Sequence, residues 1–73
     1  MTTNKFKAFF EEHFHTMVRY AYTFLSDIQE SEDIVQDAFL HLYQNFAGME
    51  NDEHARTYLY TIVHNLCISQ IRH

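Results

Sequence analysis

The sequence predicts an all-α fold, a compact bundle of three helices with one short loop between the second and the third. The chain has 73 residues, enough for one domain whose core buries roughly 60% of the surface that the unfolded chain exposes. It has no proline and a single glycine, Gly48, so few, long helices are expected in place of a many-stranded sheet. Apolar residues make up 47% of the chain and aromatic residues 16%, which argues against disorder.

The first helix is predicted to run from about Thr3 to Leu25. Its apolar residues recur at steps of three and four, which places them on one helix face. This stripe consists of Phe6, Phe10, Phe14, Met17, Ala21, Phe24 and Ile28, and it is widened by Phe9, Val18 and Leu25. Ser26-Asp27 interrupts the pattern, and Ser26 followed by Gln29 has the form of a capping box for the next helix.

The second helix is predicted to run from about Gln29 to Phe46. One face is expected to be buried, and it comprises Ile34, Val35, Ala38, Phe39, Leu42, Tyr43 and Phe46. The acids of the first turns, which favour the positive end of the helix dipole, are Glu30, Glu32 and Asp33. The polar residues expected on the outside are Asp33, Gln36, Asp37 and Gln44.

The third helix is predicted to follow a loop over Ala47–Asn51, with Gly48 as the stop of the second helix. Asn51 or Asp52 can cap this helix, which is expected to end at Ile71. Its expected inner face holds Ala55, Leu59, Ile62, Leu66 and, less regularly, Ile71, while other sides carry Arg56, Tyr60, Thr61, His64 and Arg72. Residues 58–63 favour a strand by propensity, but an isolated strand has no partner in a helical chain, so helix is predicted there.

The charges are divided along the chain. The net charge is −5, which by itself argues against nucleic-acid binding. Residues 1–19 sum to +1, residues 20–53 carry eight acids with no Lys or Arg, and residues 54–73 carry two arginines with no acid. An acidic middle and a weakly basic end suit two partners of opposite charge.

The single cysteine, Cys67, rules out an internal disulfide and fits a reducing compartment. The sequence shows no signal-peptide pattern and no apolar run that approaches the roughly 18–20 residues of a membrane span. A soluble, cytoplasmic protein without a membrane partner is therefore predicted.

Two stretches resemble a known family, the bacterial sigma factors of the extracytoplasmic-function (ECF) type. Residues 31–43, SEDIVQDAFLHLY, resemble the region 2.2 helix, whose pattern is roughly Ala-Glu-Asp-Leu-Val-Gln-Glu-x-Phe-x-x-x-Trp. Residues 58–72, YLYTIVHNLCISQIR, resemble the run Trp-Leu-x-x-Ile-Ala-x-Asn-x-x-Ile-Asp-x-x-Arg of regions 2.3 and 2.4. The first helix is similar to the family's opening segment, so the resemblance to sigma region 2 covers residues 1–73.

The chain departs from the family pattern at four positions. Tyr58 replaces the usual tryptophan and Ser69 the usual aspartate, while Thr61 and His64 stand where basic residues are common. The helix that faces DNA in this family is therefore less positive here than is typical.

The resemblance implies binding to core RNA polymerase, through region 2.2 against the coiled-coil clamp helices of the β′ subunit. Asp33 and Gln36 are neighbours on one helical ridge and are the expected contacts, with Asp37 and Leu40 on the same surface. Without the family pattern, the same acids would be interpreted as a solvated helix face.

The resemblance also implies capture of the promoter −10 element as it opens, chiefly on the non-template strand. Arg56 and Arg72 are candidates for phosphate contacts, Tyr58 and Tyr60 for stacking on unpaired bases, and Asn65 for a base edge. Thr61 and His64 complete this candidate set, and the alternative for Tyr58 is a place in the core.

The loop after the second helix corresponds to the segment that, in this family, receives a flipped-out −10 base. It comprises Ala47, Gly48, Met49, Glu50, Asn51 and Asp52. Its acids, together with Glu53, would repel phosphate, so base recognition there must keep the DNA backbone at a distance.

The residues give no sign of catalysis, and neither a metal nor another cofactor is predicted. His13 and His15 are two apart and face different sides of a helix, and Cys67 has no companion ligand. There is no nucleophile elbow and no phosphate-cradling glycine loop.

Two functions of different classes are weighed. The first is a transcription-initiation domain that binds polymerase and single-stranded promoter DNA. The alternative is a helical protein-interaction module with an acidic docking face and no DNA binding. In this family an anti-sigma factor is a common partner, and a second domain that recognises the −35 element, region 4, normally follows; we expect it to be absent from this chain, which should not direct promoter-specific initiation alone.

Overall fold

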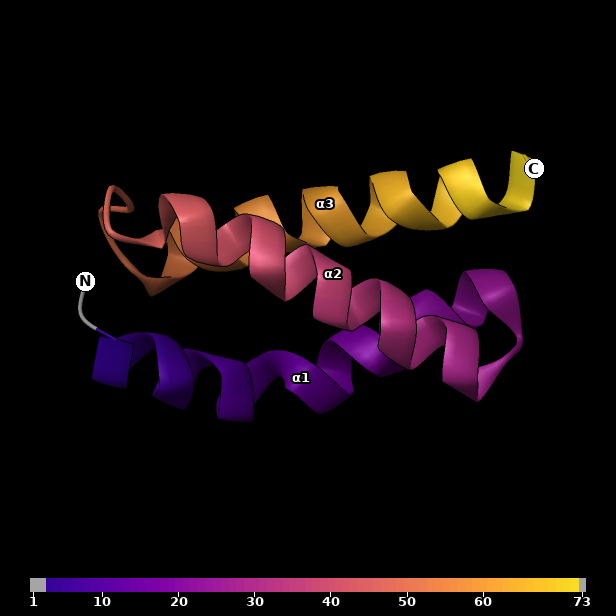
Figure 1. The fold of residues 1–73 in the computed structure, drawn as a ribbon, viewed down its shortest axis with the longest axis horizontal. Coiled ribbons are helices and arrows are strands. Elements are labelled where there is room, and N and C mark those ends of the chain that lie inside the picture. Colours follow the sequence, from indigo (N-terminus) through magenta and orange to yellow (C-terminus); the bar gives the residue numbers. More distant parts are fainter. Residues whose placement is uncertain (1–2, 73) are drawn as a thin grey trace.

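The computed structural model describes residues 3–72 and contains three helices. They are α1 (Thr3–Leu25), α2 (Ile28–Phe46) and α3 (Asp52–Arg72), and no strand occurs within the described residues. Consecutive helices run in opposite directions, so α1 and α3 both point toward the end of the bundle where the C-terminal segment lies (Figure 1). Each helix packs against both of the others in a bundle of 34 × 19 × 16 Å. The predicted all-α three-helix fold is confirmed.

Helix α2 contributes the most regular part of the core. Six of the seven residues predicted on its inner face are buried, namely Ile34, Val35, Ala38, Phe39, Leu42 and Phe46. The prediction for Tyr43 was wrong, because its side chain is 52% exposed. Ser31, which was not predicted inside, is fully buried, and its hydroxyl donates to the carbonyl of Asp27 at 2.7 Å. That hydrogen bond satisfies the buried hydroxyl.

Helix α1 buries the middle of its predicted stripe most completely. Met17 and Ala21 are inaccessible to solvent, and Phe9 and Val18 are nearly so. The half-buried residues packed at the margin of this face are Phe6, Phe10, Phe14, Phe24 and Leu25. Ile28 does not belong to the stripe, because the chain has already reversed and Ile28 opens α2 with a 59% exposed side chain.

The turn between α1 and α2 corrects the predicted capping box. Ser26 has a φ of 54°, and its N–H donates to the carbonyl of Tyr22 at 2.9 Å, so it ends α1 in the left-handed conformation. Asp27 has extended backbone, and its carboxylate accepts from the N–H of Glu30 at 2.9 Å. Asp27 is therefore the N-cap of α2, and the prediction for Ser26 was wrong.

The loop between α2 and α3 is closed by backbone hydrogen bonds. The N–H groups of Gly48 and Met49 donate to the carbonyls of Asn45 and Phe46 at 3.1 and 3.0 Å. α2 ends at Phe46, two residues before Gly48, which was predicted as its stop; Gly48 does not have a positive φ. Met49 turns inward and is only 9% exposed.

The loop leads into α3 through Asn51, whose side-chain oxygen accepts from the N–H of His54 at 2.8 Å. The predicted cap at Asn51 or Asp52 is thus resolved in favour of Asn51.

Helix α3 buries one residue per four along its length: Ala55, Leu59, Val63 and Cys67, all inaccessible to solvent. Ile62 and Leu66, predicted on this face, lie only at its margin, whereas Val63 and Cys67 were not predicted inside. Ile71, also predicted inside, is 55% exposed near the helix end. Residues 58–63 are helical, as expected. None of the described helices is long and apolar enough to cross a membrane.

Candidate functional site

A polar ridge lies on the outer face of α2. It consists of Asp33, Gln36, Asp37 and Leu40, all exposed, with Leu40 at 64%. Their spacing of three, one and three residues keeps them on one side of the helix. The carboxylate of Asp33 accepts from the side-chain amide of Gln29 at 3.0 Å, which fixes its position beside Gln36. The structure thus brings together all four residues that the sequence assigned to polymerase binding.

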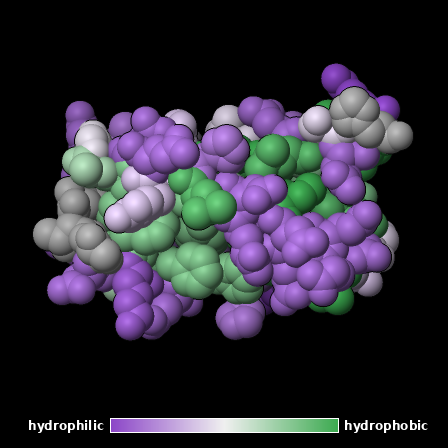
Figure 2. All heavy atoms as spheres, in the orientation of Figure 1, coloured by the Kyte–Doolittle hydropathy of each residue, from purple (hydrophilic) through white to green (hydrophobic). Residues whose placement is uncertain are grey.

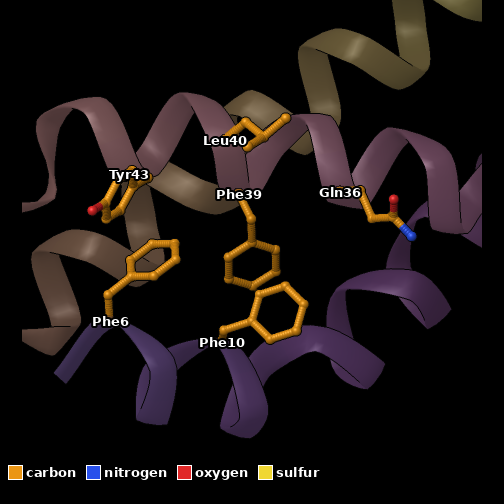
Figure 3. Close-up of a pocket in the computed structure, with 6 residues that line it drawn as sticks. All are labelled: Phe6, Phe10, Gln36, Phe39, Leu40 and Tyr43. Atoms are coloured by element: carbon orange, nitrogen blue, oxygen red, sulfur yellow. The ribbon is translucent and has the colours of Figure 1, made fainter. Parts of the chain in front are cut away.

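An apolar groove borders this ridge between α1 and α2. It has a volume of about 520 Å³ and is lined by Phe6, Phe10, Gln36, Phe39, Leu40 and Tyr43. In Figure 3 the rings of Phe6 and Phe10 on α1 face Tyr43 and Phe39 on α2. Figure 2 shows hydrophobic surface over α1 and α2 on this face, surrounded by hydrophilic side chains.

The aromatic rings that line the groove pack against one another across the two helices. Phe6 contacts Tyr43 at 4.9 Å between ring centroids, and Phe10 contacts Phe39 at 4.7 Å, both edge to face. Sequence reasoning assigned Phe6, Phe10 and Tyr43 to the core and missed this surface. The available signal was the width of the α1 stripe, whose many large side chains leave several at the margin of the buried face.

The outer face of α3 gathers four of the residues predicted to bind DNA. Thr61, His64, Asn65 and Arg72 are all exposed, and no acid occurs on α3 after Glu53. The last three line a hollow of about 530 Å³ together with Ile68 and Ser69, which the sequence reasoning did not include. The hydroxyl of Thr61 donates to the carbonyl of Thr57 at 3.1 Å. His73, the last residue of the acid-free stretch, lies outside the described residues.

The two tyrosines of α3 lie on different sides of the helix. Tyr60 packs edge to face on Tyr20 of α1 at 5.1 Å. Tyr58 faces α2, where its hydroxyl accepts from the side-chain amide of Asn45 at 3.3 Å. Both side chains are half-buried. A single strand therefore cannot stack on both rings while following one face of α3.

Arg56 is exposed but lies apart from the hollow on the outer face of α3. It lines a smaller hollow of about 140 Å³ with Glu12, His13, Asp52 and Glu53. The carboxylates of Glu12, Asp52 and Glu53 attract the positive guanidinium but would repel a phosphate. The structure thus separates Arg56 from Arg72, the other predicted phosphate contact.

The loop predicted to capture a base is exposed except at Met49. The exposed members are Ala47, Gly48, Glu50, Asn51 and Asp52. With Met49 buried, any base contact in this loop falls to its backbone and to its polar side chains.

Within the described part of the chain, the histidines and the cysteine do not converge. His13 packs on the ring of Phe9 at 4.3 Å and is 15% exposed, whereas His15 is exposed. Burial raises the pKa of the Cys67 thiol, because desolvation disfavours the thiolate. No group of three His, Cys, Asp or Glu side chains within residues 3–72 is arranged to hold a metal ion.

The chain is similar to known proteins along most of its length. A family model described as Sigma-70 region 2 matches residues 9–73. The ECF RNA polymerase sigma factor SigW of Bacillus subtilis (strain 168) is 39% identical over 51 residues, which are 70% of this chain and 27% of that protein. The chain therefore spans little more than a quarter of that relative's length. No solved structure matches the chain.

Proposed function

The chain belongs to the Sigma-70 region 2 family, and we propose that it binds core RNA polymerase with α2 and the opened −10 element of a promoter with α3 and the preceding loop. This is a non-enzymatic family of transcription initiation factors. Membership in it confirms that residues 31–43 and 58–72 resemble sigma factor sequences. The two contacts themselves, and the residues that make them, are the proposal.

The observation that carries this proposal is the division of charge between two exposed helix faces. The ridge of Asp33, Gln36, Asp37 and Leu40 lies in a stretch of 34 residues, 20–53, without Lys or Arg. Carboxylates and a carboxamide suit the arginines and polar groups of a protein partner, here the β′ clamp helices. An apolar groove beside the ridge adds area that a protein, but not a phosphate backbone, can bury.

The outer face of α3 supports the DNA contact. It offers one arginine, Arg72, with Asn65 and His64 around a shared hollow and no carboxylate among the lining residues. Asn65 has the donors and acceptor needed at a base edge, and Arg72 can hold a phosphate. We assign Tyr58 rather than Tyr60 to base stacking, because Tyr60 is engaged with Tyr20 of α1.

The test is the salt dependence of binding to a single strand that carries a −10-like sequence. The domain should bind less tightly as salt rises, and Arg72→Ala should weaken binding at all sequences and reduce the log–log salt slope by about 0.7. Arg56→Ala should change the slope less, because its surroundings are acidic. Asn65→Ala should alter preference at one position.

The protein-interaction module remains the second candidate, and the groove with its rim of Leu40 and Tyr43 is the feature that favours it. That candidate predicts no salt-dependent binding to any single strand. Salt-independent behaviour of the folded domain, with both arginine variants equal to the parent, would decide in its favour.

A further inference from the structure

Asn45, the penultimate residue of α2, connects the loop to the tyrosine assigned to base stacking. Its backbone carbonyl accepts from the N–H of Gly48 at 3.1 Å and from the N–H of Ala47, which begins the loop. Its side-chain nitrogen donates to the hydroxyl of Tyr58 at 3.3 Å and to the carbonyl of His41 at 3.4 Å. One residue thus holds both the start of the loop and the ring on α3.

The bond to Asn45 restrains the ring of Tyr58. Tyr58 is half-buried and packs at the margin of the core, so its ring is already restricted on one side. The amide of Asn45 fixes the hydroxyl at the other end of the ring. A ring held at both ends loses less conformational freedom when a base stacks on it.

The same bonds leave Asn45 with a single uncommitted group. A carboxamide has two N–H donors and one carbonyl oxygen that accepts. Both side-chain hydrogen bonds use the nitrogen, and among residues 3–72 no donor reaches the side-chain oxygen of Asn45. This exposed residue therefore presents an acceptor next to Tyr58.

We infer that Asn45 is a positioning and specificity-determining residue for the captured base: its side-chain amide orients Tyr58, and its side-chain oxygen favours a base with an exocyclic amino group. This inference rests on the proposed single-strand binding. Cytosine carries an amino group at C4 where uracil carries a carbonyl oxygen, so an acceptor directed at that position favours cytosine. The two bases also differ at N3, which accepts in cytosine and donates in uracil, so the preference reports an acceptor placed against C4 and not against N3.

The experiment compares the affinities of the domain for oligo(dC) and oligo(dU) of about 12 nucleotides, a length within the range of single-strand sites. The parent should prefer oligo(dC) by about fivefold, the effect of one hydrogen bond. Asn45→Ala should remove that preference. Gln44→Ala, the exposed neighbour on α2, is the matched control and should retain it.

Positioning through Tyr58 is tested by a double-mutant cycle. Tyr58→Phe keeps the ring but removes the hydroxyl that Asn45 holds, so it should weaken binding of both oligonucleotides by a small factor, about threefold. Asn45→Ala added to Tyr58→Phe should then weaken oligo(dU) binding no further, because the two residues act through one bond. Far-UV circular dichroism confirms that each variant is folded.

The outcomes separate the inference from the proposed function. If the parent binds both oligonucleotides equally, or if Asn45→Ala retains the preference for oligo(dC), Asn45 has no role in specificity although single-strand binding stands. Additive effects of Asn45→Ala and Tyr58→Phe would overturn the positioning role. If the folded parent binds neither oligonucleotide, the proposed DNA contact itself is contradicted, and the inference falls with it.

Discussion

The carboxylate of Asp27 accepts a hydrogen bond from the backbone N–H of Glu30 at 2.9 Å and thereby caps α2, the helix that carries the ridge. Ser26, immediately before it, ends α1 with a left-handed backbone. Two adjacent residues therefore end one helix and begin the next. They set the direction in which α2, with the ridge on it, runs from the turn.

Removal of this cap should destabilise the domain. Asp27→Ala is expected to lower the free energy of unfolding by about 1 kcal/mol, because an N–H of the first turn loses its acceptor. Asp27→Asn should remain close to the parent, since asparagine caps as well as aspartate. Urea unfolding measures both, with Ser26→Ala as the neighbouring control. A larger loss in Ser26→Ala than in Asp27→Ala would show that Ser26 is the cap after all.

Gly48 can be replaced by alanine without strain. It has no positive φ, and an added Cβ would meet only the carbonyl oxygen of Asn45, at an ordinary contact distance of 3.6 Å. Gly48→Ala should therefore raise the free energy of unfolding by about 0.4–1 kcal/mol, because the unfolded chain loses conformational freedom. Thermal unfolding followed by circular dichroism measures the change. A decrease in the unfolding midpoint would mean that the loop needs glycine.

Leu59 and Ile71 lie on the buried and the exposed face of α3, so substitutions at these two residues test how the helix is oriented. Leu59 is inaccessible to solvent, whereas Ile71 is 55% exposed. Leu59→Ala should cost about 2–5 kcal/mol through lost burial and the cavity left behind, and Ile71→Ala less than about 0.5 kcal/mol. Equal losses in urea unfolding would contradict the orientation of α3.

Cys67 should react slowly with thiol reagents in the folded protein. Burial raises its pKa above the ordinary value of 9.0, so the thiolate fraction at neutral pH is reduced and access is blocked. Because the folded pKa is the higher one, this group stabilises the fold fully below the unfolded pKa and loses that contribution as pH rises through the folded pKa. Labelling rates at pH 8, with and without urea, measure the protection. Equal rates would show that α3 opens readily at Cys67.

The helix count, the loop and most of the core follow from the sequence. Residues that are buried against neighbouring helices recur every three or four positions, and this apolar period is visible in the sequence. Two of the misplaced assignments, Ile28 and the cap of α2, lie at the turn between α1 and α2, where periodicity carries no information. Ile28 continues the α1 stripe at a step of four, but the chain reverses at Ser26 before reaching it. Ser26 and Asp27 are both good caps, and only their backbone conformations distinguish them.

The candidate site was predictable in part. The ridge residues follow from the family pattern, and three of them also from their polarity, and the structure places all four on one face. The groove did not follow, because Phe6 and Tyr43 have the same apolar spacing whether a third helix covers them or solvent does. The separation of Tyr58 from Tyr60 and of Arg56 from Arg72 depends on contacts with α1 and α2 that lie far away in sequence.

The measurement that tests the central claim most directly is retention of core RNA polymerase, or of its β′ clamp helices alone, on the immobilised domain. The parent should retain it, and Asp33→Ala and Gln36→Ala should each weaken retention by about tenfold, the effect of losing a hydrogen bond to a charged group. Gln44→Ala, also exposed on α2, should bind like the parent. No retention by the folded parent would contradict polymerase binding. Full retention by both ridge variants would show that neither Asp33 nor Gln36 contributes to the contact.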